Sequence, residues 1–271
     1  MLPEQLTALL PLIDTVSPVS GGDIHRAFRV VLASGKIIFV KTHHDPPSAI
    51  FEVEANGLGL LNRAVPGLCP EVVAVCDQGL ALEWLELKPG RRGAVLGRAL
   101  ATLHRVQAPS FGGQPDNYLA TIKQAQPECS SWAELYTEHR LAPLLGNLPK
   151  SLAQAIESLL PKLASLLDLP DPPSWLHGDL WSGNAGETAG GRACVFDPAV
   201  STGHREQDLA MTLLFGGFNA DFYRAYEEVY PLTHGWRDRV SLHQIYPLLV
   251  HVVLFGDAYH HQALDAVERW L

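Results

Sequence analysis

The stretch WLHGDLWSGN, which runs from Trp175 to Asn184, is the part of the sequence that decides the fold prediction. It brings His177, Asp179 and Asn184 into one short loop, and Asp197 ends the β-rich run ACVFD soon afterwards. Transfer of a phosphoryl group to a hydroxyl needs a carboxylate that accepts or orients the hydroxyl proton, and oxygen ligands for Mg²⁺. The spacing H-x-D-x₄-N followed by a strand-end aspartate supplies both, and it is typical of the catalytic loop of kinases.

The residues of this loop also have ordinary structural explanations. A lone Asp179 could cap a helix or close an Asx turn, although its neighbours favour a catalytic position. We expect His177 to brace the loop through hydrogen bonds rather than to act as a base. Asp208, in the helical run EQDLA, is likewise expected to be a buried carboxylate that supports the loop.

The region after the loop departs from the pattern of protein kinases. Gly178 stands where those enzymes carry Arg, and DPA replaces DFG at Asp197. Asp208 follows Asp197 by only eleven residues, with no A-P-E motif, whereas a protein kinase places a long activation segment there. Because the chain lacks this platform for an extended peptide, we expect a small substrate with a hydroxyl group.

Three features near the amino terminus suit the binding of a nucleotide. Gly21 and Gly22, in VSGGDIH before the first predicted strand, would let backbone amides approach phosphates. Lys41 ends the run IIFVK and Glu54 lies on the next predicted helix, so the lysine can hold phosphates while the glutamate holds the lysine. Glu52 is the weaker candidate for this pairing. Taken singly, these features are an ordinary turn, an edge charge and a surface glutamate.

The hydrophobic pattern predicts a β-rich first part and a helical second part. The first ninety residues predict strand, strand, helix, strand and strand, with Gly35 free to take a positive φ in the hairpin turn ASGK. After KPGRRG the pattern is mostly helical, and Pro161 is expected to kink or break one helix. We therefore expect a nucleotide-gripping lobe over residues 1–87 and a catalytic and substrate lobe over residues 88–271.

Composition argues against several kinds of partner. The chain has 271 residues and a net charge of −9, without a run of Lys and Arg, so nucleic acid is not expected. The amino terminus MLPEQLTALLPLI has no basic flank and predicts a short amphipathic helix instead of a signal peptide. The apolar run IYPLLVHVVLF is interrupted by Pro247 and His251 and is shorter than the roughly 20 residues that span a membrane, so no membrane contact is expected.

The cysteines and histidines indicate no metal site and no disulfide framework. The four cysteines form no CxxC pair; they are Cys69, Cys76, Cys129 and Cys194. The histidines cluster only as the neighbouring pairs at 43–44 and 260–261, and we do not expect a structural metal at either pair. This pattern fits a reducing, cytoplasmic location.

In their order along the chain these motifs resemble the fructosamine kinases (ketosamine-3-kinases), within the wider group of aminoglycoside phosphotransferases and choline kinases. The matching stretches cover the chain nearly end to end: PVSGGDIHRAFRV, FVK, FEVEANGLGLL, LGRALATLH, FGGQPDNYLATIKQ, WAELYTEHRLAPLL, WLHGDLWSGN, FDPAVSTGHREQDLAMTLLFGGF and FYRAY. HGDLWSGN together with the DPA-to-FGGF stretch is specific to this family, whereas an H-G-D loop alone indicates only the wider group.

The resemblance implies an α+β, bilobal, protein-kinase-like fold with a small β-rich amino-terminal lobe and a larger, mostly helical carboxyl-terminal lobe. It implies phosphorylation of a ketoamine by ATP and Mg²⁺ at the O3 hydroxyl of the sugar. The ketoamine would be a small molecule or a glycated protein. Loss of the phosphate would then free the amine, so the family is interpreted as one of protein repair by deglycation.

The resemblance also implies roles for residues of the catalytic loop. Asp179 would be the catalytic base, and Asn184 and Asp197 would be the Mg²⁺ ligands. Trp181 would stack on the sugar, since a large aromatic two residues after the base in a tight loop is expected to face the cleft. The alternative for Trp181 is a place in the core.

In the first lobe the resemblance implies contacts to the nucleotide. Lys41 and Glu54 would form the phosphate-gripping pair. Glu83, Trp84 and Leu85 would form the hinge that contacts adenine.

Two other functions stay open. The chain could be a small-molecule kinase of the same fold that acts on an aminoglycoside, choline or another amino alcohol, although LWSGN and FGGF fit the ketoamine kinases better. It could also be a nucleotide-binding pseudokinase that serves as an interaction module. That function would require the loss of a key residue, and all of them are present: Lys41, Glu54, Asp179, Asn184 and Asp197.

Overall fold

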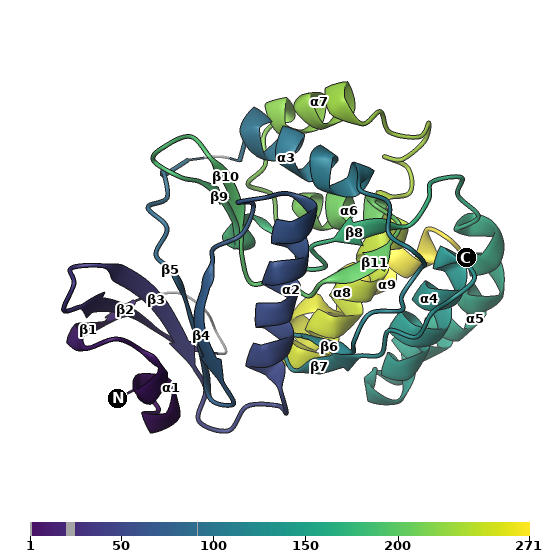
Figure 1. Cartoon of the computed structure of the whole chain (residues 1–271). Helices are drawn as coiled ribbons and strands as arrows, with labels where there is room; N and C mark the ends of the chain where they lie inside the picture. The colour runs from purple at the N-terminus through teal and green to yellow at the C-terminus, as the bar shows by residue number, and fades with distance from the viewer. Residues whose placement is uncertain (1, 20–24, 91) are drawn as a thin grey trace.

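The structure, a computed structural model, describes residues 2–19, 25–90 and 92–271. Its amino-terminal part is an antiparallel sheet of five strands in the order β1-β2-β3-β5-β4, on the left of Figure 1. The strands are β1 (Ile13–Val19), β2 (Arg26–Leu32), β3 (Ile37–Thr42), β4 (Val72–Cys76) and β5 (Gly79–Glu83). Two helices, α1 (Glu4–Leu9) and α2 (Ile50–Ala64), pack along β4 and β5.

The predicted order of strand, strand, helix, strand and strand is present from β2 to β5, and Gly35 has a φ of 82° in the hairpin turn. The sequence pattern misses β1. This strand lies at the edge of the sheet with most of its residues exposed, so it lacks the apolar alternation of a buried strand, and an edge position tolerates Pro18. The expectation that Gly21 and Gly22 precede the first strand is therefore wrong. They follow β1 in the chain and lie outside the described residues.

The carboxyl-terminal part is mostly helical (Figure 1). Its α-helices are α3 (Ala94–Arg105), α4 (Trp132–Tyr136), α5 (Lys150–Leu166), α6 (Glu206–Leu214), α7 (Ala220–Val229), α8 (Val240–Phe255) and α9 (His260–Glu268). Short antiparallel strand pairs lie among them: β6 (Asn117–Leu119) with β7 (Ile122–Gln124), β8 (Ser174–Leu176) with β11 (Ser201–Gly203), and β9 (Ala185–Glu187) with β10 (Ala193–Val195). A π-helical turn at Thr137–Leu141 and 3₁₀ turns at Ala142–Asn147, Ser182–Asn184 and Gly256–Tyr259 complete this part.

The change from sheet to helix falls between the end of β5 at Glu83 and the start of α3 at Ala94. The predicted hinge lies in this interval. The domain boundary between residues 87 and 88 stays a prediction.

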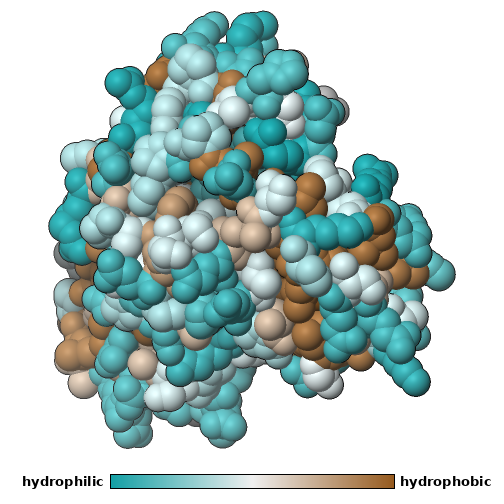
Figure 2. Space-filling model, turned by 90° about the vertical axis from the view of Figure 1, so that its right-hand side faces the viewer, coloured by the Kyte–Doolittle hydropathy of each residue, from teal (hydrophilic) through white to brown (hydrophobic). Residues whose placement is uncertain are grey.

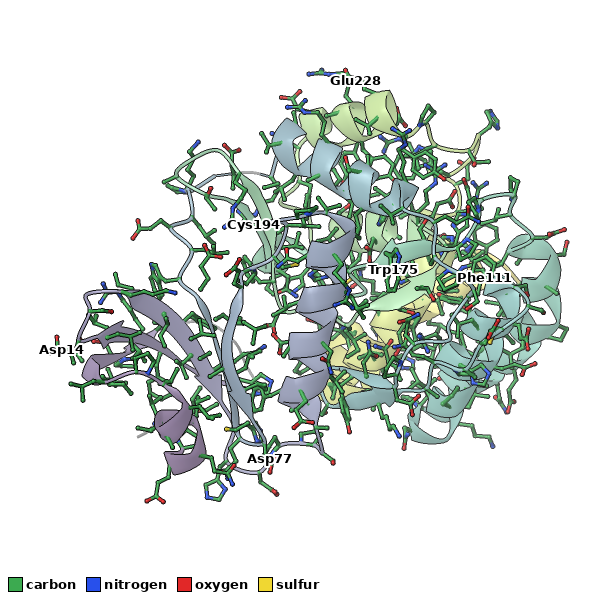
Figure 3. The ribbon with its side chains drawn as sticks, viewed as in Figure 1. Asp14, Asp77, Phe111, Trp175, Cys194 and Glu228 are labelled. Carbon is green, nitrogen blue, oxygen red and sulfur yellow. The ribbon has the colours of Figure 1, made fainter. Side chains whose placement is uncertain are left out.

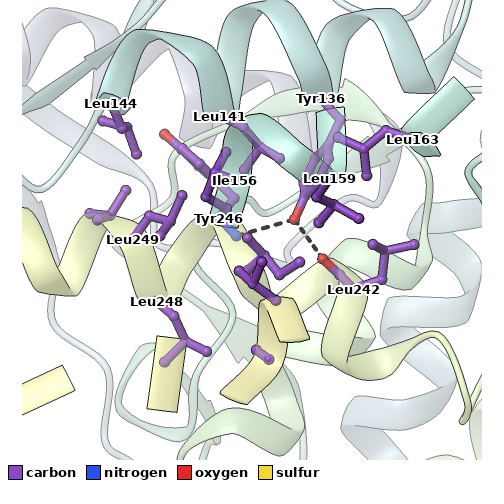
Figure 4. Close-up of a cluster of buried hydrophobic side chains, with 14 of the residues drawn as sticks. Tyr136, Leu141, Leu144, Ile156, Leu159, Leu163, Leu242, Tyr246, Leu248 and Leu249 are labelled. Carbon is purple, nitrogen blue, oxygen red and sulfur yellow. Dashed lines mark hydrogen bonds between the residues drawn. The ribbon is translucent and has the colours of Figure 1, made fainter. Parts of the chain in front are cut away.

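A large hydrophobic core lies in the helical part, where α4, α5, α8 and α9 bury their apolar faces against one another. Figure 4 shows Tyr136 among the side chains of this core. The Tyr136 hydroxyl donates to the carbonyl of Leu242 (2.7 Å) and accepts from the amide of Tyr246 (3.1 Å), so this buried polar group is fully satisfied. The core thereby ties α4 to α8.

A second hydrophobic cluster connects the two parts of the molecule. It joins Leu58 and Leu61 of α2 to Leu100 of α3 and Phe222 of α7, and it also contains Leu180 of the loop 175–184. Because one cluster includes both the helix beside the sheet and this loop, the two are held at a fixed separation.

Pro161 does not break α5, which runs continuously from Lys150 to Leu166. The helix is amphipathic, and its buried residues Leu152, Ile156 and Leu163 pack into the core of the helical part. Burial of this apolar face stabilises the helix despite the amide that proline lacks.

One helical stretch, Val240–Glu268, is long and apolar enough to cross a membrane by length and composition alone. This is weak evidence, because half of its apolar window is buried and α8 contributes Leu242, Ile245 and Leu249 to the core. Figure 2 shows hydrophobic side chains in patches on an otherwise mostly hydrophilic face. That the chain has no membrane partner stays a prediction.

Candidate active site

The loop 175–184 leaves β8 and turns sharply at Gly178. Figure 3 labels Trp175, which lies on β8 just before the turn. Gly178 has a φ of 83°, and a methyl group there would lie 1.9 Å from the carbonyl oxygen of Ala199. This close approach explains why the position that protein kinases fill with Arg is glycine in this chain.

Asp208, on α6, supports the turn from its buried side, which we call the back of the loop. Its carboxylate accepts hydrogen bonds from the backbone amides of His177 (2.7 Å) and Gly178 (2.9 Å), and it lies 3.2 Å from Nε2 of His104. Burial acts to raise the pKa of Asp208, but the hydrogen bond from His104 and the charges around it leave the pKa below its ordinary value. The carboxylate therefore stays ionised and fully bonded inside the protein.

His104 is a member of this site that the sequence reasoning missed. It is buried on α3, and its Nδ1 lies 2.8 Å from the hydroxyl of Tyr226. With Nε2 as the donor to Asp208 and Nδ1 as the acceptor from Tyr226, one neutral tautomer satisfies both contacts. The only signal in the sequence is a histidine at the end of the apolar helical run GAVLGRALATLH.

His177 uses both ring nitrogens within the loop. Its Nδ1 accepts a hydrogen bond from the amide of Asp179 (3.2 Å), and its Nε2 donates to the carbonyl of Phe196 (3.1 Å). The ring is fully buried, and burial lowers its pKa. A neutral ring with both nitrogens occupied braces the loop and has no free atom with which to accept a proton.

Asp179 and Asn184 lie on the opposite side of the loop, in direct contact. The side-chain nitrogen of Asn184 donates to the Asp179 carboxylate and to the Asp179 carbonyl, each at 3.0 Å. Burial, and next the negative charge of Asp197, raise the pKa of Asp179 to about 7. A carboxylate with a pKa near neutrality suits general base catalysis.

Lys41 joins the sheet to this site. Its ammonium group, on β3, forms ion pairs with Glu54 of α2 and with Asp197. Burial alone would lower the pKa of Lys41, but Asp197 and then Glu54 raise it above its ordinary value, so the lysine is charged. The side chains of Lys41 and Glu54 are only 6% and 10% exposed whereas that of Asp197 is 52% exposed, so the aspartate is the accessible member.

Asp197 follows β10 in a left-handed backbone conformation, with a φ of 60°. Figure 3 marks Cys194 on that strand. Few residues other than glycine adopt this conformation, although Asp and Asn tolerate it better than most. Strained backbone of this kind is typical of functional sites.

The predicted hinge residues lie at the end of β5, the strand that pairs with β3. Glu83 is the last residue of β5, and Trp84 and Leu85 follow it. The Glu83 carboxylate accepts hydrogen bonds from the Glu71 amide (3.3 Å) and Arg192 (3.4 Å). In the part of the chain that the structure describes, no hydrogen bond engages the backbone of Trp84 or Leu85.

Trp181 lies at the surface, with 40% of its area exposed, rather than in the core. Its ring covers Gly183, where an added methyl group would lie 2.2 Å from ring carbons, and it meets the ring of Phe215 edge to face at 6.2 Å. The structure thus brings Asp179, Asn184 and Trp181 together on one loop.

A second polar cluster lies beside the site, on and around α6. His204, Glu206 and His243 are buried, with atoms that could bind a metal within 4.8 Å of one another. Arg239 already donates two hydrogen bonds to the Glu206 carboxylate, at 2.9 and 2.6 Å. A metal ion would have to displace this guanidinium, so we interpret the cluster as an ion-pair network.

Known proteins resemble the chain over nearly its whole length. The pattern of the fructosamine kinase family matches residues 5–271. A protein of Enterococcus faecium named "probable ketoamine kinase" is 36% identical, over 96% of this chain and 97% of its own length. One of Lactiplantibacillus plantarum with the same name is 38% identical, over 93% of each chain.

Solved structures show the same relationship. The crystal structure of a candidate fructosamine-3-kinase from Thermobifida fusca superposes with a TM-score of 0.88 at 37% identity, over 97% of this chain and 95% of that one. A choline kinase from Streptococcus pneumoniae has a TM-score of 0.64 at 15% identity, over 98% and 97% of the two chains, which shows the shared kinase-like fold alone. The chain therefore belongs to the fructosamine kinase family.

Proposed function

We propose that the chain transfers the γ-phosphoryl group of ATP to the O3 hydroxyl of a ketoamine, a glycation product of the fructosamine or ribulosamine type. Elimination of the phosphate then frees the amine, which amounts to deglycation. One observation carries the proposal. In a member of the fructosamine kinase family, the carboxylate of Asp179 lies against Asn184, close to the ion pair of Asp197 with Lys41.

Asp179 is the proposed catalytic base. It would accept or orient the proton of the substrate hydroxyl, which makes the oxygen a better nucleophile toward the γ-phosphorus. Asn184 fixes the carboxylate by donating to it, and the raised pKa of Asp179, about 7, lets it hold a proton during the reaction. His177 and Asp208 act only by holding the loop.

Asn184 and Asp197 are the proposed ligands of Mg²⁺. They offer an amide oxygen and an accessible carboxylate, which are hard oxygen donors of the kind that this ion prefers. Because the amide nitrogen of Asn184 is used in hydrogen bonds to Asp179, its oxygen is left to bind a cation. A bound Mg²⁺ would supply positive charge to the phosphate oxygens.

The sheet supplies the proposed nucleotide site. Lys41 would hold the phosphates, and Glu54 would keep it in place. The backbone groups of Trp84 and Leu85, next to Glu83, would meet the adenine edge. Gly21 and Gly22 stay predicted phosphate contacts, and the lobes would be residues 1–87 and 88–271.

Trp181 is the proposed platform for the sugar, because its exposed ring lies on the same loop as Asp179. The substrate amine could be free or part of a protein. We place this activity in the cytoplasm, in line with the cysteine pattern.

Turnover of ATP with a panel of acceptors tests the proposal. ADP formation should depend on fructosamines or ribulosamines, and should stay at background with choline and aminoglycosides. The other small-molecule kinases of this fold predict the opposite preference, and a pseudokinase predicts no turnover with any acceptor. A ketoamine whose O3 is methylated is the matched control, because it keeps the sugar and the amine but lacks the reacting hydroxyl.

A further inference from the structure

Aromatic side chains continue outward from Trp181 as one connected surface. Phe215 meets Trp181 at 6.2 Å between ring centroids, and it lies 5.1 Å from His251 and 6.5 Å from Tyr259. His251 in turn lies 4.8 Å from Tyr259 and 5.6 Å from Phe255. We call these five residues the aromatic wall.

The aromatic wall is exposed where an ordinary core cluster would be buried. Trp181, Phe215 and Phe255 have 40%, 39% and 50% of their areas exposed. These are large apolar side chains, and exposing them together forfeits the free energy that burial would give. A contiguous apolar surface that begins two residues from Asp179 is best explained by a ligand that covers it.

The position of the wall relative to the loop is fixed by the FGGF stretch. Phe215 follows the end of α6, and Gly217, with a φ of 92°, lets the chain pass against the loop. A methyl group at Gly217 would lie 2.4 Å from the Cβ of Ser182. Phe255 is the last residue of α8 and Tyr259 ends the 3₁₀ turn that follows, so the wall rests on ordered helices.

We propose that the part of the aromatic wall beyond Trp181, from Phe215 to Phe255, binds the substituent carried by the ketoamine nitrogen while Trp181 meets the sugar, and that the chain selects ketoamines with apolar amine substituents. This inference rests on the proposed function and adds the part of the substrate that the reaction does not touch. The four-methylene stem of a lysine side chain is one such substituent, and a benzyl group is a larger one.

The chemistry of the two ends of a ketoamine decides which end faces the wall. The end beyond O3 is a chain of hydroxyl groups, which would lose hydrogen bonds to water against rings. The nitrogen is separated from the O3-bearing carbon by only two carbons, so with O3 at Asp179 and the sugar at Trp181 the amine substituent can extend toward Phe215, which adjoins Trp181. Apolar substituents gain from covering those rings.

The charge of the wall suits a protonated amine. Aromatic faces attract cations, whereas a protonated imidazole would repel one. Nδ1 of His251 lies 2.7 Å from the carbonyl of Pro247, and burial lowers the pKa of the ring, so His251 is neutral at pH 7. The wall thus adds no positive charge next to the substrate nitrogen.

The test holds the sugar constant and varies the amine. The substrates are fructosyl-methylamine and fructosyl-benzylamine, which share their charge and their reacting hydroxyl. The proteins are the unmodified chain, Phe255→Ala, Phe255→Tyr and Leu12→Ala. Leu12 is the matched control, since it is an apolar residue with 78% of its area exposed on the amino-terminal part, away from the wall.

We expect the unmodified chain to favour the benzyl substrate in kcat/KM. Phe255→Ala should reduce this preference about 3- to 10-fold, because the benzyl group loses its contact with the exposed half of the Phe255 ring. Phe255→Tyr and Leu12→Ala should keep it, and the ratio between fructosyl and ribulosyl forms of one amine should be the same in all four proteins.

Two results would overturn the inference while leaving the proposed function intact: active enzyme without a preference for the benzyl substrate, or a preference that Phe255→Ala leaves unchanged. Failure of the unmodified chain to phosphorylate any ketoamine would overturn the proposed function and this inference with it.

Discussion

The two sides of the loop 175–184 differ in how completely their polar atoms are bonded. Behind the loop, Asp208 accepts two backbone hydrogen bonds and contacts His104, and both nitrogens of His177 are occupied. In front of it, the one side-chain hydrogen bond to the Asp179 carboxylate within residues 2–19, 25–90 and 92–271 comes from Asn184, and the carboxylate of Asp197 is half exposed.

This difference separates aspartates that support the fold from aspartates whose carboxylates are available to a ligand. A buried carboxylate whose bonding capacity is filled stabilises the protein and has nothing left to offer a substrate. A carboxylate that has a raised pKa or is exposed to solvent is stabilised less well by the fold. It retains the capacity to bind metal or take up a proton. The comparison predicts that changes behind the loop alter stability and changes in front of it alter activity.

The largest expected effect is on the Mg²⁺-dependent activity of Asp197→Ala. Without this carboxylate, turnover should fall to the background of the assay at any Mg²⁺ concentration. Because alanine at a φ of 60° adds strain, Asp197→Asn is the paired variant: it should recover thermal stability without recovering normal turnover. Full activity in the asparagine variant would place the metal elsewhere.

Behind the loop, Asp208→Ala should lower the free energy of unfolding by about 3–5 kcal/mol, because it leaves the amides of His177 and Gly178 without partners inside the protein. Urea unfolding at pH 7 measures this. Asp265→Ala, at an exposed position on α9, is the control and should change stability by no more than about 0.5 kcal/mol. Equal losses in the two variants would contradict the supporting role of Asp208.

The pH dependence of stability should report on Glu206, which lies two residues before Asp208. Burial opposes ionisation of Glu206, but His243 and Arg239 lower its pKa to about 2. A depressed pKa stabilises the fold above the ordinary glutamate value and loses that contribution as pH falls toward 2. This should amount to about 3 kcal/mol. Unfolding free energies at pH 5 and pH 3 should differ less in Glu206→Gln than in the unmodified chain, and parallel pH profiles would refute the assignment.

The smallest expected effect belongs to Trp181, at the front. Trp181→Ala should raise the KM for the ketoamine and leave the KM for ATP nearly unchanged, with a loss of ~0.5–2 kcal/mol in substrate binding. Trp181→Phe should lose less because a ring remains. Since Trp181 is 40% exposed, its removal should hardly change the melting temperature. A large fall in melting temperature, with both KM values disturbed, would show that the ring belongs to the fold.

Sequence alone could predict the features that depend on residues close together in the chain. Asp179 and Asn184 lie within one loop, and Lys41 and Glu54 lie on successive elements, so local motifs already bring each pair close. The helix α2 and the hairpin around Gly35 follow from hydrophobic period and turn chemistry.

The parts that sequence reasoning missed depend on tertiary packing. His104 contacts Asp208 across more than a hundred residues, and His251 of α8 contacts Phe215, which follows α6, through the packing of α8 against α6. Neither contact leaves a periodic or local trace. β1 was missed because an exposed edge strand needs no apolar alternation, and α5 continues through Pro161 because its apolar face is buried.

The most direct test of the account measures the activity and the stability of Asp179→Asn in one preparation. Asparagine preserves the shape of the side chain and its contact with Asn184, but it cannot accept the proton. We predict that kcat with a ketoamine falls by roughly 10²–10⁴, while ATP affinity and the free energy of unfolding stay close to those of the unmodified chain. Turnover within a few-fold of the unmodified chain would contradict the assignment of Asp179 as the base, and with it the division of the loop into a supporting and a reacting side.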